Sequence, residues 1–149
     1  MASFEWIDLL GRPWVLHGDS AEGMDCSTVA EEVLRRAGTP PPATSPFRFK
    51  GSRGSLGEFE EYLSEQEGAW ERVGDNPMAA TQVGDLVMVA EGKASRGLFV
   101  LVAPQTGTFL TSLRRTGVIS VNRSTVLRSA SRVLGVYRLR TVHDLEADE

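Results

Sequence analysis

The sequence has little cysteine, little histidine and no long hydrophobic run. Among 149 residues there is one Cys, and there are two His. A single cysteine cannot form an internal disulfide, so the fold does not depend on an oxidising compartment. No apolar run approaches the roughly 18 residues that a membrane span needs. We therefore expect a fold without disulfides and a chain without a membrane span.

The chain also lacks an excess of basic residues and a basic N-terminal segment. The formal net charge is −4, and no basic stretch overrides this balance, which argues against a nucleic-acid binder. The opening stretch MASFEWIDLL contains two acids and no Lys or Arg, unlike a signal peptide. Neither the cluster HGDSAEGMD nor the glycine-rich GSRGSLG has the spacing of a metal site or phosphate-binding loop. We expect a soluble protein without a cofactor or a bound metal.

The composition that remains is that of a globular domain. Hydrophobic residues make up 41% and charged residues 24% of the chain, which is ordinary for a folded protein. A chain of this length buries roughly two-thirds of its unfolded surface as one domain. We expect one domain over residues 1–140 and a solvated acidic tail over residues 141–149.

The periodicity along the chain changes from helical to strand-like. Three helices are expected first, and short strands separated by Gly, Pro and Asn turns follow Pro77. The expected helices cover residues 4–10, 26–37 and 56–70, and the expected strands cover residues 84–92, 97–104, 106–113, 117–121 and 131–140. In the first helix, either Phe4, Ile7 and Leu10 or Trp6, Leu9 and Leu10 should point inward. Helices followed by antiparallel strands predict an α+β fold.

The stretch EGMDCSTVAEEVLRRAG places the only cysteine at the start of a helix. Asp25 can accept from free backbone N–H groups of the first turn, and Val29, Val33 and Leu34 share one face at helical spacing. Gly38 ends the helix as its C′ residue. A thiol at a helix N-terminus is favoured as thiolate, which makes Cys26 a candidate nucleophile.

The same residues carry a family resemblance. LLGRPWVLHGDSAEGMDCSTVAEEVLRRAG resembles the opening of NlpC-type cysteine peptidases, in which Gly-x-Asp-Cys-Ser-Gly begins a helix. VGDLVMV, RGLFVLVAPQTGTFLTSLRRTGVISVNRS and RVLGVYRLR are similar to the strands that follow it. The resemblance covers about residues 6–140 and is closest to the small versions in phage tail and gene transfer agent clusters. It implies a papain-like core with N-terminal helices packed on a C-terminal antiparallel sheet.

The departures from the family pattern bear on catalysis. The family's catalytic histidine corresponds to Gly97 and its second histidine to Thr111, while Thr28 replaces the glycine after Cys-Ser. Glycine and threonine cannot exchange a proton with the thiol or protonate a leaving amine. Arg96, the residue before Gly97, stays protonated and therefore cannot exchange a proton with the thiol either. The resemblance therefore implies a pseudoenzyme in which Cys26 is a vestigial nucleophile.

Two histidines are left as alternative bases. His17 lies in the loop before Cys26, which in this fold passes near the cleft, so it is the candidate base. A loop histidine bonded to backbone or water is the competing interpretation. His143 lies in the acidic tail, where solvent exposure is expected. Without a positioned base, Cys26 is a small buried hydrophobe.

Three functions remain open. The first is a structural or assembly protein of a phage tail tip or baseplate, made in the bacterial cytoplasm, with other tail or baseplate proteins as partners in a multi-subunit particle. The second is an active cysteine hydrolase that cuts peptidoglycan stem peptides with Cys26 and an unrecognised base. The third is a cytoplasmic binding module whose old cleft holds a peptide or an acyl group.

Partner contacts are expected in the loop TPPPATSPFRFKGSRGS. Its prolines reduce the entropy lost on docking, and Phe47 and Phe49 beside Arg48 would be apolar anchors. Both phenylalanines pointing into the domain core is the alternative. Trp14 is a second possible contact. The stretches SLRRTG and RSASR place basic residues at the ends of expected strands. These residues are expected either to be solvated or to provide charges for docking.

Overall fold

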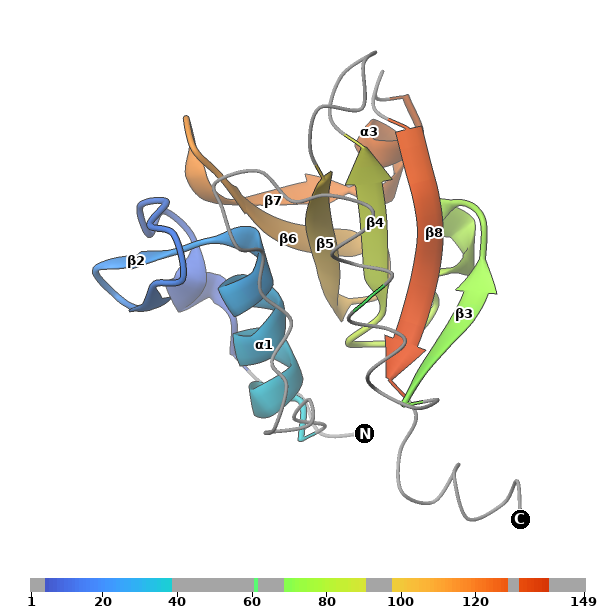
Figure 1. The fold of residues 1–149 in the computed structure, drawn as a ribbon, viewed down its shortest axis with the longest axis horizontal. Coiled ribbons are helices and arrows are strands. Elements are labelled where there is room, and N and C mark those ends of the chain that lie inside the picture. The colour runs from blue at the N-terminus through green and yellow to red at the C-terminus, as the bar shows by residue number, and fades with distance from the viewer. Residues whose placement is uncertain (1–4, 39–60, 62–68, 91–97, 129–131, 140–149) are drawn as a thin grey trace.

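A helix packed on an antiparallel sheet forms the body of the molecule (Figure 1). The computed structural model describes residues 5–38, 61, 69–90, 98–128 and 132–139. Within these residues, the single long helix α1 (Cys26–Arg36) contacts strands β5 and β6 (Leu98–Gln105 and Thr108–Leu113). The prediction of an α+β fold is confirmed. None of the described helices has the length and apolar character that crossing a membrane requires.

The main sheet has six strands in the order β3-β8-β4-β5-β6-β7, and every pairing is antiparallel. Its remaining strands are β3 (Trp70–Gly74), β4 (Leu86–Ala90), β7 (Gly117–Asn122) and β8 (Arg132–Leu139). The short helix α3 (Arg123–Arg128) follows β7 directly and contacts the 3₁₀ turn η2 (Pro77–Ala79). Strands β3 and β7 are thus the two edges of the sheet.

Both faces of the sheet are buried, which explains the nearly continuous hydrophobic runs of its central strands. On β4, Leu86, Met88 and Ala90 pack on the α1 side, and Val87 and Val89 pack on the opposite side. The α1 face buries Leu9, Met24, Cys26, Val29, Ala30, Val33, Leu86, Met88, Ala90, Val100, Val102, Leu110 and Val118. The other face buries Ala80, Val87, Val89, Leu101, Ala103, Phe109, Val126 and Val136 beneath α3 and η2.

The segment before α1 closes the β7 edge of the sheet. The N–H of Gly11 donates to the carbonyl of Val118 (2.9 Å), and the N–H of Val118 donates to the carbonyl of Arg12 (2.9 Å). Gly117, with φ of 70°, makes this approach possible, because a Cβ there would collide with the carbonyl oxygen of Arg12. The chain then forms a small hairpin of β1 (Asp19–Ser20) and β2 (Gly23–Met24) that leads into α1.

Two ion-pair groups tie distant segments together. Arg36 at the end of α1 binds Asp8 (2.6 Å) and Glu32 (2.7 Å), which holds α1 to the N-terminal turn. These hydrogen bonds to Arg36 lower the pKa of the Asp8 carboxyl. Asp85, fully buried before β4, receives two hydrogen bonds from Arg138 of β8 (2.9 and 2.8 Å). A charge-assisted pair with fork geometry links the two strands.

The structure corrects the expected elements in three places. The first helix is only the 3₁₀ turn η1 (Ile7–Leu9), in which Leu9 is buried while Ile7 is 70% and Leu10 37% exposed. The inward orientation of Ile7 and Leu10 was therefore wrong, since a single turn has no continuous apolar face. Trp70, expected to end a helix, instead begins β3. The β1–β2 hairpin, η2 and α3 were not predicted, because elements of two to six residues are too short for a periodicity.

Several predictions concern residues outside the described part of the chain. These are the proline-rich loop with Phe47, Arg48 and Phe49, most of the expected helix over residues 56–70, the position Gly97, and the tail with His143. They stay predictions.

Candidate functional site

Cys26 is the first residue of α1, and Asp25 is its N-cap. The Asp25 Oδ1 accepts from the N–H of Thr28 (2.9 Å) and from the hydroxyl of Ser27 (2.6 Å). The Thr28 hydroxyl in turn accepts from the N–H of Asp25 (2.9 Å), which completes a capping box. The predicted cap is confirmed. Thr28, which stands where the family pattern has glycine, serves as the reciprocal half of this cap.

The Cys26 thiol lies inside the core rather than on its surface. The residue is 7% exposed and packs with the buried side chains of the α1 face. Burial raises the pKa of Cys26 to about 12, the N–H of Val100 partly opposes this by favouring thiolate, and the nearby charge of Asp25 raises the pKa further. At neutral pH the thiol is therefore protonated, and the helix N-terminus does not outweigh desolvation.

The sheet presents apolar and hydroxyl side chains to the beginning of α1. On β5, Val100 and Val102 belong to the α1 face, and Val102 pairs with Leu110 of β6. Two residues further along β6, on the same face by strand alternation, the Ser112 hydroxyl donates to the carbonyl of Met24 (2.7 Å). Val100 and Ser112 thus face the beginning of α1.

Thr111 lies on the other side of β6. It alternates with Leu110 and Ser112 and shares the parity of Phe109, which packs in the core beneath α3. Its buried hydroxyl donates to the carbonyl of Val100 (2.8 Å), within the sheet. The resemblance placed the family's second histidine at Thr111, but the residue of β6 that faces α1 at this level is Ser112. Which of the two residues faces α1 depends on the register of β6 against β5, which the sequence alone does not give.

His17 is held close to the start of α1 through its backbone. The turn Val15–Gly18 closes with a bond from the Gly18 N–H to the Val15 carbonyl (2.9 Å), and His17 takes the left-handed conformation with φ of 59°. The N–H of His17 donates to Asp25 Oδ2 (2.7 Å). The carboxylate of Asp25 therefore caps the helix with one oxygen and fixes the His17 turn with the other. This contact brings the backbone of the candidate base to the residue next to Cys26.

Trp14 belongs to the same N-terminal segment but stacks elsewhere. It is half-buried, and the guanidinium of Arg114 lies over its ring at 5.4 Å from the centroid, a cation–π arrangement. Among the described residues, no three His, Cys, Asp or Glu side chains gather as a metal site would require. The chemistry that this arrangement offers is a buried thiol, a structural carboxylate and hydroxyl groups.

Comparison with solved structures relates this arrangement to known proteins. A Staphylococcus aureus subsp. aureus Mu50 protein, described as similar to a lipoprotein of the NLP/P60 family, superposes with a TM-score of 0.53 and 19% sequence identity. The match covers 91% of this chain and 39% of that chain. The chain has an NlpC/P60-like fold. No family model and no curated protein matches the sequence.

The NlpC/P60-like fold accounts for the layout of the site. The helix that begins with Cys26 packs against β5 and β6, as the resemblance implied, and the structural match extends over 91% of the chain. This chain spans well under half of the Staphylococcus aureus protein, so the likeness concerns the domain alone. At this level of identity it is a likeness of fold, and function has to be argued from the residues at Cys26.

Proposed function

We propose that this NlpC/P60-like domain is catalytically inactive and serves as a structural or assembly protein of a phage tail or tail-like particle. The observation that carries the inactivity is the environment of Cys26. Its thiol is buried, its pKa is raised to about 12, and the strand beside it presents Val100. A cysteine nucleophile needs a lowered pKa or an adjacent base.

The particle context rests on the sequence resemblance to the small NlpC-type domains of phage tail and gene transfer agent clusters. A domain without chemistry is retained for its contacts, so its partners would be other tail or baseplate proteins. The same proposal includes the location of the protein: it acts in the particle, and the particle is assembled in the bacterial cytoplasm. Burial of the old nucleophile in the core supports it, because Cys26 then contributes packing instead of reactivity.

The alternative is a cysteine hydrolase acting on peptidoglycan stem peptides, with His17 as the base. The bond from His17 to Asp25 favours it, since it holds the loop of a histidine beside the helix start. For that chemistry, substrate binding would have to expose the thiol and turn the imidazole toward it.

Muropeptide release separates the two functions. Purified protein is incubated with peptidoglycan, and soluble fragments are measured by chromatography beside the Cys26→Ala and His17→Ala variants. We expect all three proteins to release the same background amount. Release by the unmodified chain that both substitutions abolish would establish the hydrolase. For the particle context, mass spectrometry of tail particles from the source bacterium should detect the chain at a fixed ratio to other tail proteins, and its absence there would contradict the proposal.

A further inference from the structure

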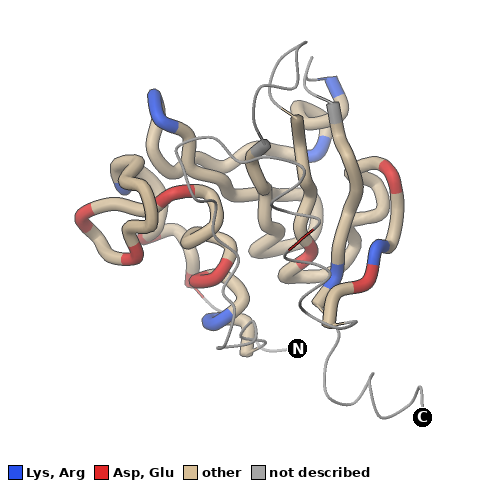
Figure 2. Tube along the Cα trace, viewed as in Figure 1, with Lys and Arg blue, Asp and Glu red and all other residues tan. Residues whose placement is uncertain are grey.

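Residues 5–18, which precede the helix that begins with Cys26, run alongside α1 and contact both of its ends (Figure 1). We call them the N-terminal strap. At the last turn of α1, the two Nη atoms of Arg36 donate to the Asp8 carboxylate (2.6 and 3.0 Å), and Nη1 also donates to the carbonyl of Glu5 (3.0 Å). Figure 2 shows both signs of charge along the second half of α1. At this end of the helix, the strap is fastened by charge.

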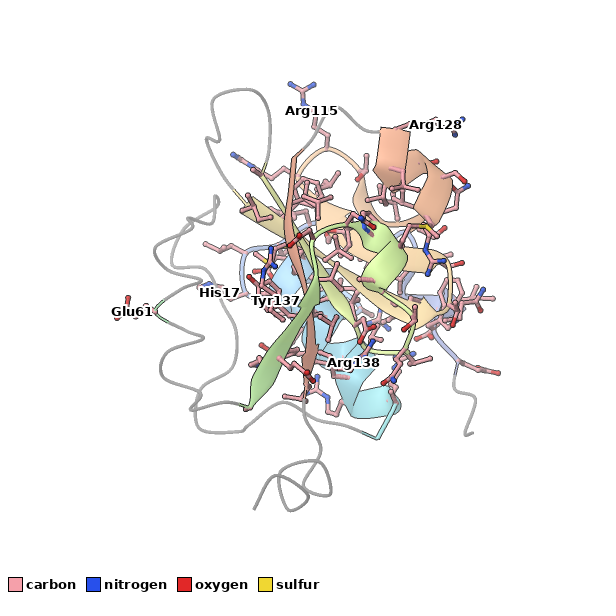
Figure 3. The ribbon with its side chains drawn as sticks, turned by 90° about the vertical axis from the view of Figure 1, so that its right-hand side faces the viewer. His17, Glu61, Arg115, Arg128, Tyr137 and Arg138 are labelled. Atoms are coloured by element: carbon pink, nitrogen blue, oxygen red, sulfur yellow. The ribbon has the colours of Figure 1, made fainter. Side chains whose placement is uncertain are left out.

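The later part of the strap holds the two residues directly before Cys26. The N–H of Met24 donates to the carbonyl of Pro13 (2.9 Å). The N–H of His17 (Figure 3) donates to Oδ2 of Asp25 (2.7 Å). Because Met24 and Asp25 immediately precede the cysteine, the position of the thiol depends on the strap being in place.

The strap also closes the core in which the thiol lies. Leu9 of the strap is 0% exposed and belongs to the same buried cluster as Met24, Cys26 and Val118. The Arg12 guanidinium donates to the sulfur of Met24 (3.6 Å). Lifting the strap would therefore withdraw one apolar side chain from this cluster and remove the bonds that hold Met24.

The strap is fastened more weakly than the core that it covers. Every residue of the strap is described, and Leu9 is its one buried residue, whereas eight of the 11 residues of α1 are buried. The Asp8 side chain is 49% exposed, so water and salt screen its attraction to Arg36. Segments with few buried apolar contacts open at a lower free energy than the core does. We therefore expect the strap to lift while α1 and the sheet stay folded.

Backbone strain in the strap favours the same opening. His17 has a φ of 59°, in the left-handed region that is unfavourable for a residue with a Cβ atom. The bond from its N–H to Asp25 belongs to the closed strap and helps to hold this conformation. Lifting the strap would break this bond and relieve the strain.

We propose that the N-terminal strap is a salt-sensitive gate over Cys26. While Asp8 binds Arg36, the strap is closed and the thiol is enclosed in the core. When the strap lifts, the start of α1 loosens and the thiol becomes accessible. The controlling ion pair lies ten residues along α1 from the thiol, about 15 Å away, so access is controlled from the opposite end of the helix. This gate goes beyond the proposed function and does not depend on it, because it concerns access to the thiol.

Alkylation of the unmodified full chain tests the gate without any substitution. Cys26 is labelled with iodoacetamide at about pH 8, at about 50 mM and about 500 mM salt, and at urea concentrations well below the unfolding transition. Opening a short segment exposes little surface, so labelling should depend on urea far less than global unfolding does. High salt screens the pair of Asp8 and Arg36 and should accelerate labelling about threefold. A urea dependence equal to that of global unfolding would overturn the proposal.

A neutral substitution identifies the ion pair that fastens the strap. Asp8→Asn keeps the size of the side chain but removes the charge that binds Arg36, so Cys26 should be labelled about fivefold faster and the acceleration by salt should disappear. Asp75→Asn is the matched control, because it breaks the exposed ion pair with Arg72 of β3 and should leave both the rate and its salt response unchanged. Equal labelling of Asp8→Asn and the unmodified chain, or an equal acceleration by Asp75→Asn, would contradict the gate.

Discussion

At the scale of single residues, Asp25 has more contacts than a helix cap requires. Its two carboxylate oxygens accept from Thr28, Ser27 and the backbone of His17, and the residue is 5% exposed. The same negative charge raises the pKa of Cys26. One carboxylate therefore stabilises the start of α1, fixes the preceding loop and disfavours the thiolate.

Replacing Asp25 should destabilise the fold measurably. Asp25→Ala removes the cap and leaves the N–H groups of Thr28 and His17 without their acceptor, so we expect a loss of about 2 kcal/mol in the free energy of unfolding. Asp25→Asn keeps an acceptor oxygen and should cost less. Urea denaturation measures both, with Asp19→Ala in the exposed hairpin as the control that changes stability by less than about 0.5 kcal/mol. Equal stability of Asp25→Ala and the unmodified chain would contradict this role.

At the scale of elements, the long periodic segments were predictable and the short ones were not. The apolar face of α1 and its Gly38 stop followed from spacing and backbone preference, as did strands β4 to β8. The register was not accessible in the same way: whether Thr111 or Ser112 faces α1 depends on a shift between β5 and β6. A one-residue shift exchanges the two faces of a strand. The pairing of Gly11 and Arg12, in the segment before α1, with Val118 of β7 was not predicted, because it depends on a strand distant in the sequence.

The contact between this segment and β7 can be tested through two glycines. Gly107 and Gly117 both have positive φ, of 85° and 70°, but a Cβ meets nothing within 4 Å at Gly107 and the Arg12 carbonyl at Gly117. Gly107→Ala should cost about 1 kcal/mol through backbone strain alone. Gly117→Ala should cost about 3 kcal/mol, since it also displaces the segment from β7. Chemical denaturation of both variants measures the difference, and equal losses would show that the segment contributes nothing there.

At the scale of the whole molecule, an NlpC/P60-like layout is combined with a buried thiol. The sequence was enough for the fold class and for Cys26 at a helix start, since both depend on local patterns. The expectation that Cys26 is a small buried hydrophobe agrees with its 7% exposure, whereas the residues that enclose it, among them Val100, could not be predicted from local patterns. The helix N-terminus alone indicated an activated thiol, and desolvation reverses that expectation.

The pH dependence of Cys26 alkylation tests the central claim, that this thiol is buried and protonated, most directly. The native chain is treated with iodoacetamide from about pH 6 to pH 11, with the urea-unfolded chain as the reference for an accessible thiol of ordinary pKa. Because the folded pKa is raised to about 12, we predict labelling far slower than in the reference below pH 9 and a rate that keeps rising to the end of the range. Fast labelling at pH 6, with a plateau below pH 8, would show an activated thiolate and contradict the account.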